Sequence, residues 1–164
     1  MRVVNVSQDA TLIYEFLPED LRLRLVAEVE SSDIRKREYW LDDLGKEDVP
    51  LAVLEAKRVA EKRLGLRFNF GILKWYRLDD KYESQAYEVH RDPPHLTSIP
   101  LVLLTVKGEA DLVYWTPEGD ERFVRCVPNL GVLLDGNLLH KITPPMGEER
   151  VRYLLFLGWD STRT

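Results

Sequence analysis

The spacing of apolar residues predicts two helices within the first 65 positions. In PEDLRLRLVAEVE, residues 18–30, apolar side chains recur every four positions, as on one stripe of a helix: Leu21, Leu25 and Val29. Pro18 and the two acids that follow it are typical of a helix start. A second helix is expected from about Asp48, as N-cap, to Leu64, with Gly65 as the C-terminal cap.

From Leu66 onward the pattern changes to short strands about every ten residues, separated by Pro, Gly, Asn and Asp. Eight segments are expected to be strands: RFNFGILKWYRL (67–78), QAYEVHRD (85–92), SIPLVLLTV (98–106), ADLVYW (110–115), ERFVRCV (121–127), GVLLDG (131–136), LHKIT (139–143) and RVRYLLFLGW (150–159). Before Leu66, TLIYEF (11–16) alternates like one more short strand, whereas REYWLDDLG (37–45) favours no structure.

This many short strands in one stretch favours a closed double-sheet jelly roll. We therefore expect an α+β, mainly β fold with N-terminal helices packed on a double-stranded β-helix. The 164 residues suit one domain, with 1–65 as helical support and 66–160 as the jelly-roll core.

Composition excludes some classes of protein. No apolar run reaches the roughly 18 residues of a membrane helix, and Met1-Arg2 leads into VVNVS without the apolar region of a signal peptide. The single cysteine, Cys126, has no disulfide partner within the chain and is expected to be a buried thiol, which fits a cytoplasmic location. A net charge of −5 argues against general nucleic-acid affinity, which depends on Lys and Arg neutralising phosphates.

Two of the three histidines lie close together in YEVHRDPPH, residues 87–95. On a strand, His90 and Asp92 would point to the same face, and Pro93 favours extended geometry at Asp92. A jelly roll can bring His140, at the start of a later strand, beside them. Two imidazoles and one carboxylate form a facial triad that leaves positions open for a co-substrate and O2, which suits non-haem Fe(II). The same donors could also hold a catalytic zinc, although HExxH is absent from the sequence.

The last predicted strand adds two arginines. Arg150 and Arg152 would share one face of RVRYLLFLGW, and the apolar residues would share the other. An arginine that faces inward needs an anionic partner, because burying an unpaired charge is costly. A dicarboxylate co-substrate could supply that partner in bidentate geometry. Taken alone, the better interpretation is an arginine that pairs with an acidic side chain of the chain or reaches solvent at the start of the strand.

Together, HRD, LLHKITPP and GEERVRYLLFLGW resemble the HxD…H…R signature of the Fe(II)- and 2-oxoglutarate-dependent dioxygenases. The resemblance covers about residues 66–160 and, more loosely, YEFLPEDL. It implies that His90, Asp92 and His140 hold Fe(II). Arg152 is the best match for the arginine that grips the distal carboxylate of 2-oxoglutarate, and Arg150 is the second choice.

The resemblance also suggests two further contacts to the co-substrate. Tyr76 matches a position where related enzymes place a tyrosine, which could equally be a core aromatic. Thr105 could offer a second hydroxyl, judged from strand register. The implied reaction uses O2 and 2-oxoglutarate, releases succinate and carbon dioxide, and hydroxylates a C–H bond of a small molecule or a peptide side chain.

Two alternatives remain. FNFGILKWY followed by HRD is similar to the alkylation-repair demethylase branch, in which an asparagine stands in place of Lys74 and an arginine in place of Gly158. These differences and the acidic composition disfavour a nucleic-acid substrate. The other alternative is a jelly-roll binding module without catalysis. The sequence leaves the oligomeric state open.

Overall fold

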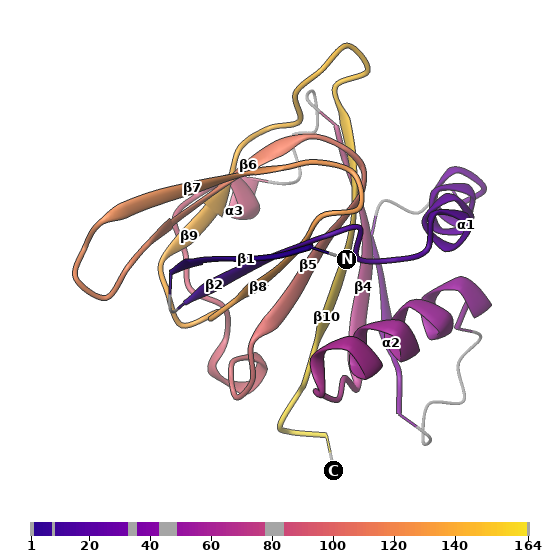
Figure 1. Ribbon diagram of the computed structural model, residues 1–164, viewed down its shortest axis with the longest axis horizontal. Helices are drawn as coiled ribbons and strands as arrows, with labels where there is room; N and C mark the ends of the chain where they lie inside the picture. Colours follow the sequence, from indigo (N-terminus) through magenta and orange to yellow (C-terminus); the bar gives the residue numbers. More distant parts are fainter. Residues whose placement is uncertain (1, 8, 33–35, 43–48, 78–83, 164) are drawn as a thin grey trace.

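The computed structural model describes residues 2–7, 9–32, 36–42, 49–77 and 84–163. Its main layer is an antiparallel seven-stranded sheet in the order β1-β2-β8-β5-β10-β4-β3, and a three-stranded sheet in the order β7-β6-β9 packs on one of its faces. Figure 1 shows the two longer helices on the opposite face of the large sheet. The expected jelly roll with N-terminal helices packed on it is therefore confirmed.

The strand bounds place most of the sheet in the predicted segments. The large sheet consists of β1 (Arg2–Ser7), β2 (Ala10–Tyr14), β3 (Lys36–Trp40), β4 (Phe70–Arg77), β5 (Leu101–Gly108), β8 (Gly131–Leu134) and β10 (Val151–Gly158). The small sheet consists of β6 (Ala110–Trp115), β7 (Glu121–Cys126) and β9 (His140–Ile142). Because β1, β2 and β3 pair into the large sheet, the segment 1–65 supplies strands as well as helices, and the expected division at Leu66 does not interrupt the sheet.

The helices begin and end where local chemistry allows. Helix α1 (Glu19–Glu30) follows Pro18, and α2 (Leu51–Leu64) follows Pro50. Gly65 ends α2 in the left-handed conformation with φ +67°, and its N–H donates to the Glu61 carbonyl at 2.9 Å, as expected of a C-terminal cap. Asp48, the expected N-cap of the second helix, lies outside the described residues.

Both faces of the central strands of the large sheet are buried. One face packs against the helices. This core cluster includes Leu25 of α1, Val53 of α2, Leu104 of β5 and Leu155 of β10. The other, inner face packs against the small sheet through a second cluster that includes Leu112, Tyr114, Val132 and Leu154. Burial on both faces explains why β5 reads as a continuous apolar run rather than an alternating one.

One strand prediction was wrong. The segment 85–92 is not a strand: α3 (Ser84–Tyr87) is a single helical turn, and only His90 pairs, through an isolated antiparallel bridge to His140. The helical turn lets Ala86 and Tyr87, which are adjacent in sequence, both pack on the inner cluster, whereas a strand would point them to opposite faces. After Asp92, the two prolines lack the N–H groups that a ladder requires, and a 3₁₀ turn (Pro94–Leu96) follows.

None of the helices among the described residues is both long and apolar enough to cross a membrane.

Candidate metal centre

The small sheet brings the two segments that carry the histidines together. His90 N–H donates to the His140 carbonyl at 3.0 Å, and His140 N–H donates back to the His90 carbonyl at 2.9 Å. This exchange fixes the two residues directly opposite each other, and their ring centroids are 4.5 Å apart. Sequence reasoning placed these residues on neighbouring strands, and the structure brings them together through the single bridge.

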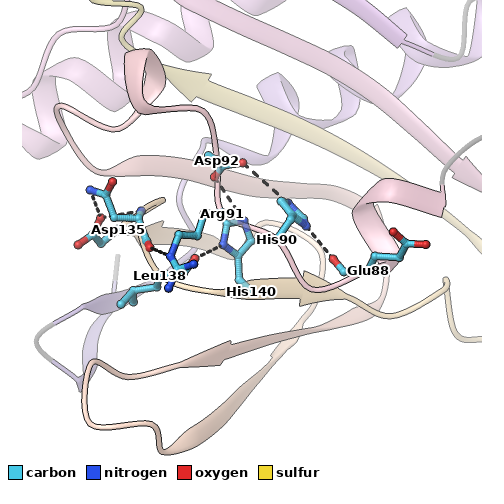
Figure 2. Close-up of polar contacts among 8 residues, drawn as sticks. Glu88, His90, Arg91, Asp92, Asp135, Leu138 and His140 are labelled. Carbon is cyan, nitrogen blue, oxygen red and sulfur yellow. Dashed lines mark hydrogen bonds and ion pairs between the residues drawn. The ribbon is translucent and has the colours of Figure 1, made fainter.

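Asp92 completes the group. Its Oδ2 lies 3.3 Å from His140 Nε2, and its Oδ1 lies 3.9 Å from His90 Nε2. Figure 2 shows the Asp92 carboxylate joined by a dashed line to each of the two imidazoles. One donor atom from each of the three side chains lies within 4.8 Å of the others. Donors that share one metal at about 2.1 Å each are separated by about 3 Å or slightly more, so small side-chain movements would bring all three onto one ion.

Both imidazoles are oriented by backbone carbonyls two residues earlier in the chain. His90 Nδ1 lies 2.7 Å from the Glu88 carbonyl, and His140 Nδ1 lies 2.8 Å from the Leu138 carbonyl. A carbonyl oxygen can only accept a hydrogen bond, so in a neutral ring Nδ1 carries the hydrogen. Nε2 then has the free electron pair that can bind a metal. This second hydrogen bond is the usual device that fixes the tautomer of a metal-binding histidine. Both Nε2 atoms face Asp92, as a metal site requires.

The electrostatics favour a cation at this point. Burial of His140 by itself would lower its pKa, but the hydrogen bond and the charge of Asp92, helped by the Leu138 carbonyl, outweigh burial, so the pKa of His140 is raised. A partly buried carboxylate between two rings thus attracts positive charge. The donor set of two imidazoles and one carboxylate is the set that holds non-haem Fe(II), and the residues present fit that ion.

A cavity of about 550 Å³ lies between the two sheets and contains the triad. The remaining residues that line it come from β3, β4, β5, β6, β9, β10 and the segment 86–96: Lys36, Ile72, Lys74, Tyr76, Ala86, Glu88, Val89, Arg91, Pro93, Leu96, Leu103, Leu112, Ile142, Arg152, Leu154 and Phe156. The metal donors and Arg152 therefore open into one space, whose wall is mostly apolar.

Arg152 is almost completely buried, with 1% of its surface exposed. Thr105 Oγ1 accepts from Nη2 at 2.9 Å and from Nε at 3.3 Å. Arg152 Nη1 is buried without a hydrogen-bond partner among the described residues. A charged donor left in this state is costly, and a carboxylate in the cavity would satisfy it. The arrangement fits a dicarboxylate such as 2-oxoglutarate.

The other predicted co-substrate residues lie in three different environments. Tyr76 is buried, lies directly opposite Arg152 across β4 and β10, and lines the cavity. Thr105 is fully buried behind Arg152 and is not among the described residues that line the cavity. Arg150 is exposed, precedes β10 and has φ +52°, so it does not share the face of Arg152 as the strand alternation suggested. Left-handed backbone at Arg150 breaks that alternation.

Several groups that position the site residues could not be predicted from the side-chain types in the sequence. The carbonyls of Glu88 and Leu138 belong to the backbone, and the sequence pattern gives no signal for them. The turn Asp135–Asn137 contacts the segment that carries His90 and Asp92. The Gly136 carbonyl accepts from Asp92 N–H at 3.0 Å, and the Asn137 carbonyl accepts from Arg91 Nε at 3.0 Å. The only signal was the turn composition of DGN shortly before His140.

Comparison with solved structures places the fold. A prolyl-4-hydroxylase from Pseudomonas putida superposes with a TM-score of 0.62 at 19% identity, covering 93% of this chain and 92% of the other. A prolyl hydroxylase from Trichoplax adhaerens was solved with a peptide fragment of the oxygen degradation domain of hypoxia inducible factor. It superposes with a TM-score of 0.68 at 13% identity, covering 95% of this chain and 86% of the other. OsALKBH1 superposes with a TM-score of 0.61 at 12% identity, covering 96% of this chain and 100% of the other.

These neighbours are Fe(II)- and 2-oxoglutarate-dependent oxygenases. The chain shares their jelly-roll fold. Together with the grouping of His90, Asp92 and His140, this confirms the resemblance that the motifs suggested. No protein-family model and no curated protein matches the sequence, so the likeness to these structures is one of fold.

Proposed function

We propose that this protein is an Fe(II)- and 2-oxoglutarate-dependent oxygenase. His90, Asp92 and His140 would hold Fe(II), and Arg152 would bind the distal carboxylate of 2-oxoglutarate. The observation that carries the proposal is the shared cavity: the three metal donors and buried Arg152, whose Nη1 has no hydrogen-bond partner among the described residues, line one space of about 550 Å³. A buried guanidinium without a described acidic partner has a stability cost, which a bound carboxylate would offset.

The chain's own groups have distinct tasks in this reaction. Bound Fe(II) with 2-oxoglutarate and O2 supplies the oxidation of a C–H bond, coupled to decarboxylation of 2-oxoglutarate to succinate, which side chains alone cannot perform. The two carbonyl-bound imidazoles keep their Nε2 atoms directed at the metal position. Thr105 fixes the plane of the Arg152 guanidinium, and Tyr76 lies beside it, where its hydroxyl could contact the same carboxylate. The apolar wall excludes water from the reacting atoms.

The preferred substrate is a small molecule or a peptide side chain that becomes hydroxylated. The cavity is large enough for a co-substrate and part of a second molecule, and its lining includes Leu112, Ile142 and Leu154. Such a wall suits an aliphatic carbon that must approach the metal. The peptide complex of the Trichoplax neighbour supports an accessible site of this kind in the same fold.

The proposal is tested by anaerobic titration of the metal-free protein with Fe(II) and then 2-oxoglutarate, with absorbance recorded in the visible region. Chelation of Fe(II) by 2-oxoglutarate is expected to produce a metal-to-ligand charge-transfer band. His140→Ala is expected to abolish the band. His95→Ala is the matched control, because His95 is exposed in the 3₁₀ turn beside the site and is not a member of the triad.

The outcomes separate the rival functions. A band that is lost in His140→Ala and kept in His95→Ala supports the proposal. Absence of the band from folded wild-type protein overturns it and favours a binding module. Tight binding of Zn²⁺ with no response to 2-oxoglutarate favours a catalytic zinc site. Release of succinate that depends on an added candidate substrate, with the oxidised product identified by mass, then identifies the reaction.

A nucleic-acid demethylase is the second candidate, favoured by one observation. Lys36, Lys74 and Arg91 line the cavity of a chain whose net charge is −5, and Lys36 and Lys74 are direct cross-strand neighbours. Basic groups around a cavity could contact phosphates. Binding to a single-stranded oligonucleotide that weakens steeply with salt would support this candidate, and no binding at low salt would exclude it.

A further inference from the structure

The turn that leads to His140 is held by its own hydrogen bonds. Asp135 Oδ1 accepts from the backbone N–H of Asn137 at 2.9 Å and from its side-chain amide at 3.0 Å. The backbone N–H of Leu138 donates to the Asp135 carbonyl at 3.1 Å. The turn therefore has a defined shape that does not depend on a ligand.

The same turn grips the segment that carries Asp92. The Gly136 carbonyl accepts from Asp92 N–H at 3.0 Å, next to the mutual His90–His140 bridge. Figure 2 shows Arg91 reaching towards the turn, where its Nε donates to the Asn137 carbonyl at 3.0 Å. Because the backbone is fixed on both sides, the position of the Asp92 carboxylate depends mainly on its two side-chain torsions and on the space around it.

Gly136 leaves that space open. It is buried, and a Cβ built on it would lie 2.9 Å from Asp92 Oδ2, the oxygen that faces His140. The same Cβ would lie 2.8 Å from Leu101 Cδ1 and 3.0 Å from Thr97 Cγ2. Contacts below 3.0 Å are essentially never made by a Cβ, so a neighbour must move if a side chain is added.

We propose that Gly136 is a positioning residue for the metal ligand Asp92, and that the absence of a side chain at 136 sets where the carboxylate lies. This inference rests on the proposed function, since it takes Asp92 as a ligand of Fe(II). Gly136 acts through Asp92 and does not touch the metal. The turn thus helps to position two of the three donors. It leads directly to His140, and the absence of a side chain at Gly136 leaves room for the Asp92 carboxylate.

An alanine at 136 would displace the carboxylate more readily than its other neighbours. Leu101 is completely buried, and close packing leaves a buried side chain little room to move. Asp92 borders the cavity, so its carboxylate can rotate into open space. Rotation would move Oδ2 away from His140, so the three donor atoms could no longer reach one metal ion together.

The first test uses the metal-free protein and does not depend on the proposed function. The free energy of unfolding is measured for wild type, Gly136→Ala, Asp92→Ala and the double variant. If the added methyl group presses on the carboxylate, Gly136→Ala destabilises less when Asp92 is already alanine, and the cycle shows a coupling between the two positions. Additive effects would overturn the proposed contact.

The second test measures Fe(II) affinity by anaerobic calorimetry. Gly136→Ala is expected to weaken binding by about 10- to 100-fold, the usual cost of disturbing the support of a metal ligand. Gly158→Ala is the matched control: its Cβ would also press on Leu101, at 3.2 Å, and on Phe156, but not on a metal donor. Its Fe(II) affinity is expected to equal that of wild type even if its stability falls.

The outcomes distinguish this inference from the proposed function. Wild-type protein that binds no Fe(II) refutes the proposed function, and the role of Gly136 in metal binding with it. Wild-type protein that binds Fe(II), with Gly136→Ala matching Gly158→Ala, refutes the positioning role alone. If Gly136→Ala does not fold, the same measurements are made with Leu101→Val added, which removes the atom closest to the new methyl group.

Discussion

Arg152 and Thr105 form a buried pair in which the hydroxyl accepts from two nitrogens on one edge of the guanidinium, at 2.9 and 3.3 Å. The pair fills the hydrogen-bonding capacity of that edge and leaves Nη1 without a described partner. Thr105 therefore orients the charge rather than neutralising it. Such an arrangement has a stability cost that a carboxylate ligand would offset.

Replacing Arg152 by methionine is expected to separate binding from stability. The variant should lose 2-oxoglutarate binding, seen as loss of the charge-transfer band with Fe(II) affinity retained. Its free energy of unfolding should stay unchanged or rise, because a buried charge without a partner is replaced by an apolar side chain of similar length. Arg150→Met is the control and should bind 2-oxoglutarate normally, since Arg150 is exposed. The reverse result would reassign the anchor to Arg150.

Thr105→Val should weaken 2-oxoglutarate binding without removing it. Valine has the shape of threonine but offers no acceptor, so the two Arg152 nitrogens lose their partner and the guanidinium loses its fixed orientation. Two buried donors without a partner should lower the free energy of unfolding by about 1–3 kcal/mol. Thr105→Ser, which keeps the hydroxyl, should restore both properties. Equal affinities in Thr105→Val and wild type would show that Thr105 has no role in orientation.

The fold was largely predictable because turn residues separate the strands and both sheets have apolar faces. Where the sequence pattern was ambiguous, tertiary contacts decide. Residues 37–40, the first four of REYWLDDLG, lie in β3 at the edge of the large sheet, although the local pattern favoured no structure. The segment 85–92 was expected to be a strand from the regular spacing of turn residues, but packing of Ala86 and Tyr87 on one side favours a helical turn.

The site was predictable only in part, for a physical reason. Charged and metal-binding side chains such as His90, Asp92 and Arg152 can be read from residue type and spacing. Contacts made by backbone carbonyls, and space left by a missing side chain at Gly136, have no such signal. Arg150 shows the same limit, since a left-handed φ at one residue reverses an inference from strand alternation.

Tyr76→Phe distinguishes a co-substrate contact from core packing. Tyr76 lies opposite Arg152 and lines the cavity, so its hydroxyl can reach a carboxylate bound there. If it does, the variant should raise KM for 2-oxoglutarate by about tenfold, the equivalent of one hydrogen bond of roughly 1.4 kcal/mol. A purely structural ring would leave KM unchanged, because phenylalanine keeps the packing. Fe(II) affinity, measured in parallel, should be equal in both proteins.

Cys126 should make stability depend on pH in the alkaline range. Burial raises the pKa of its thiol, despite the opposing charge of Arg152. In the unfolded chain the thiol loses its proton near pH 8.5. Above that pH the native state holds more protons than the unfolded state, so the free energy of unfolding falls as pH rises, by up to about 1.4 kcal/mol per pH unit.

The measurement is denaturant unfolding between about pH 7.5 and 10 for wild type and Cys126→Ala. Buried tyrosines contribute a slope of the same sign, because burial also raises the pKa of Tyr39 and Tyr153, but they are common to both proteins. The difference between the two curves therefore isolates the thiol, and it should decrease steadily above about pH 8.5. A constant difference across this range would mean that Cys126 ionises as readily in the folded protein as in the unfolded chain.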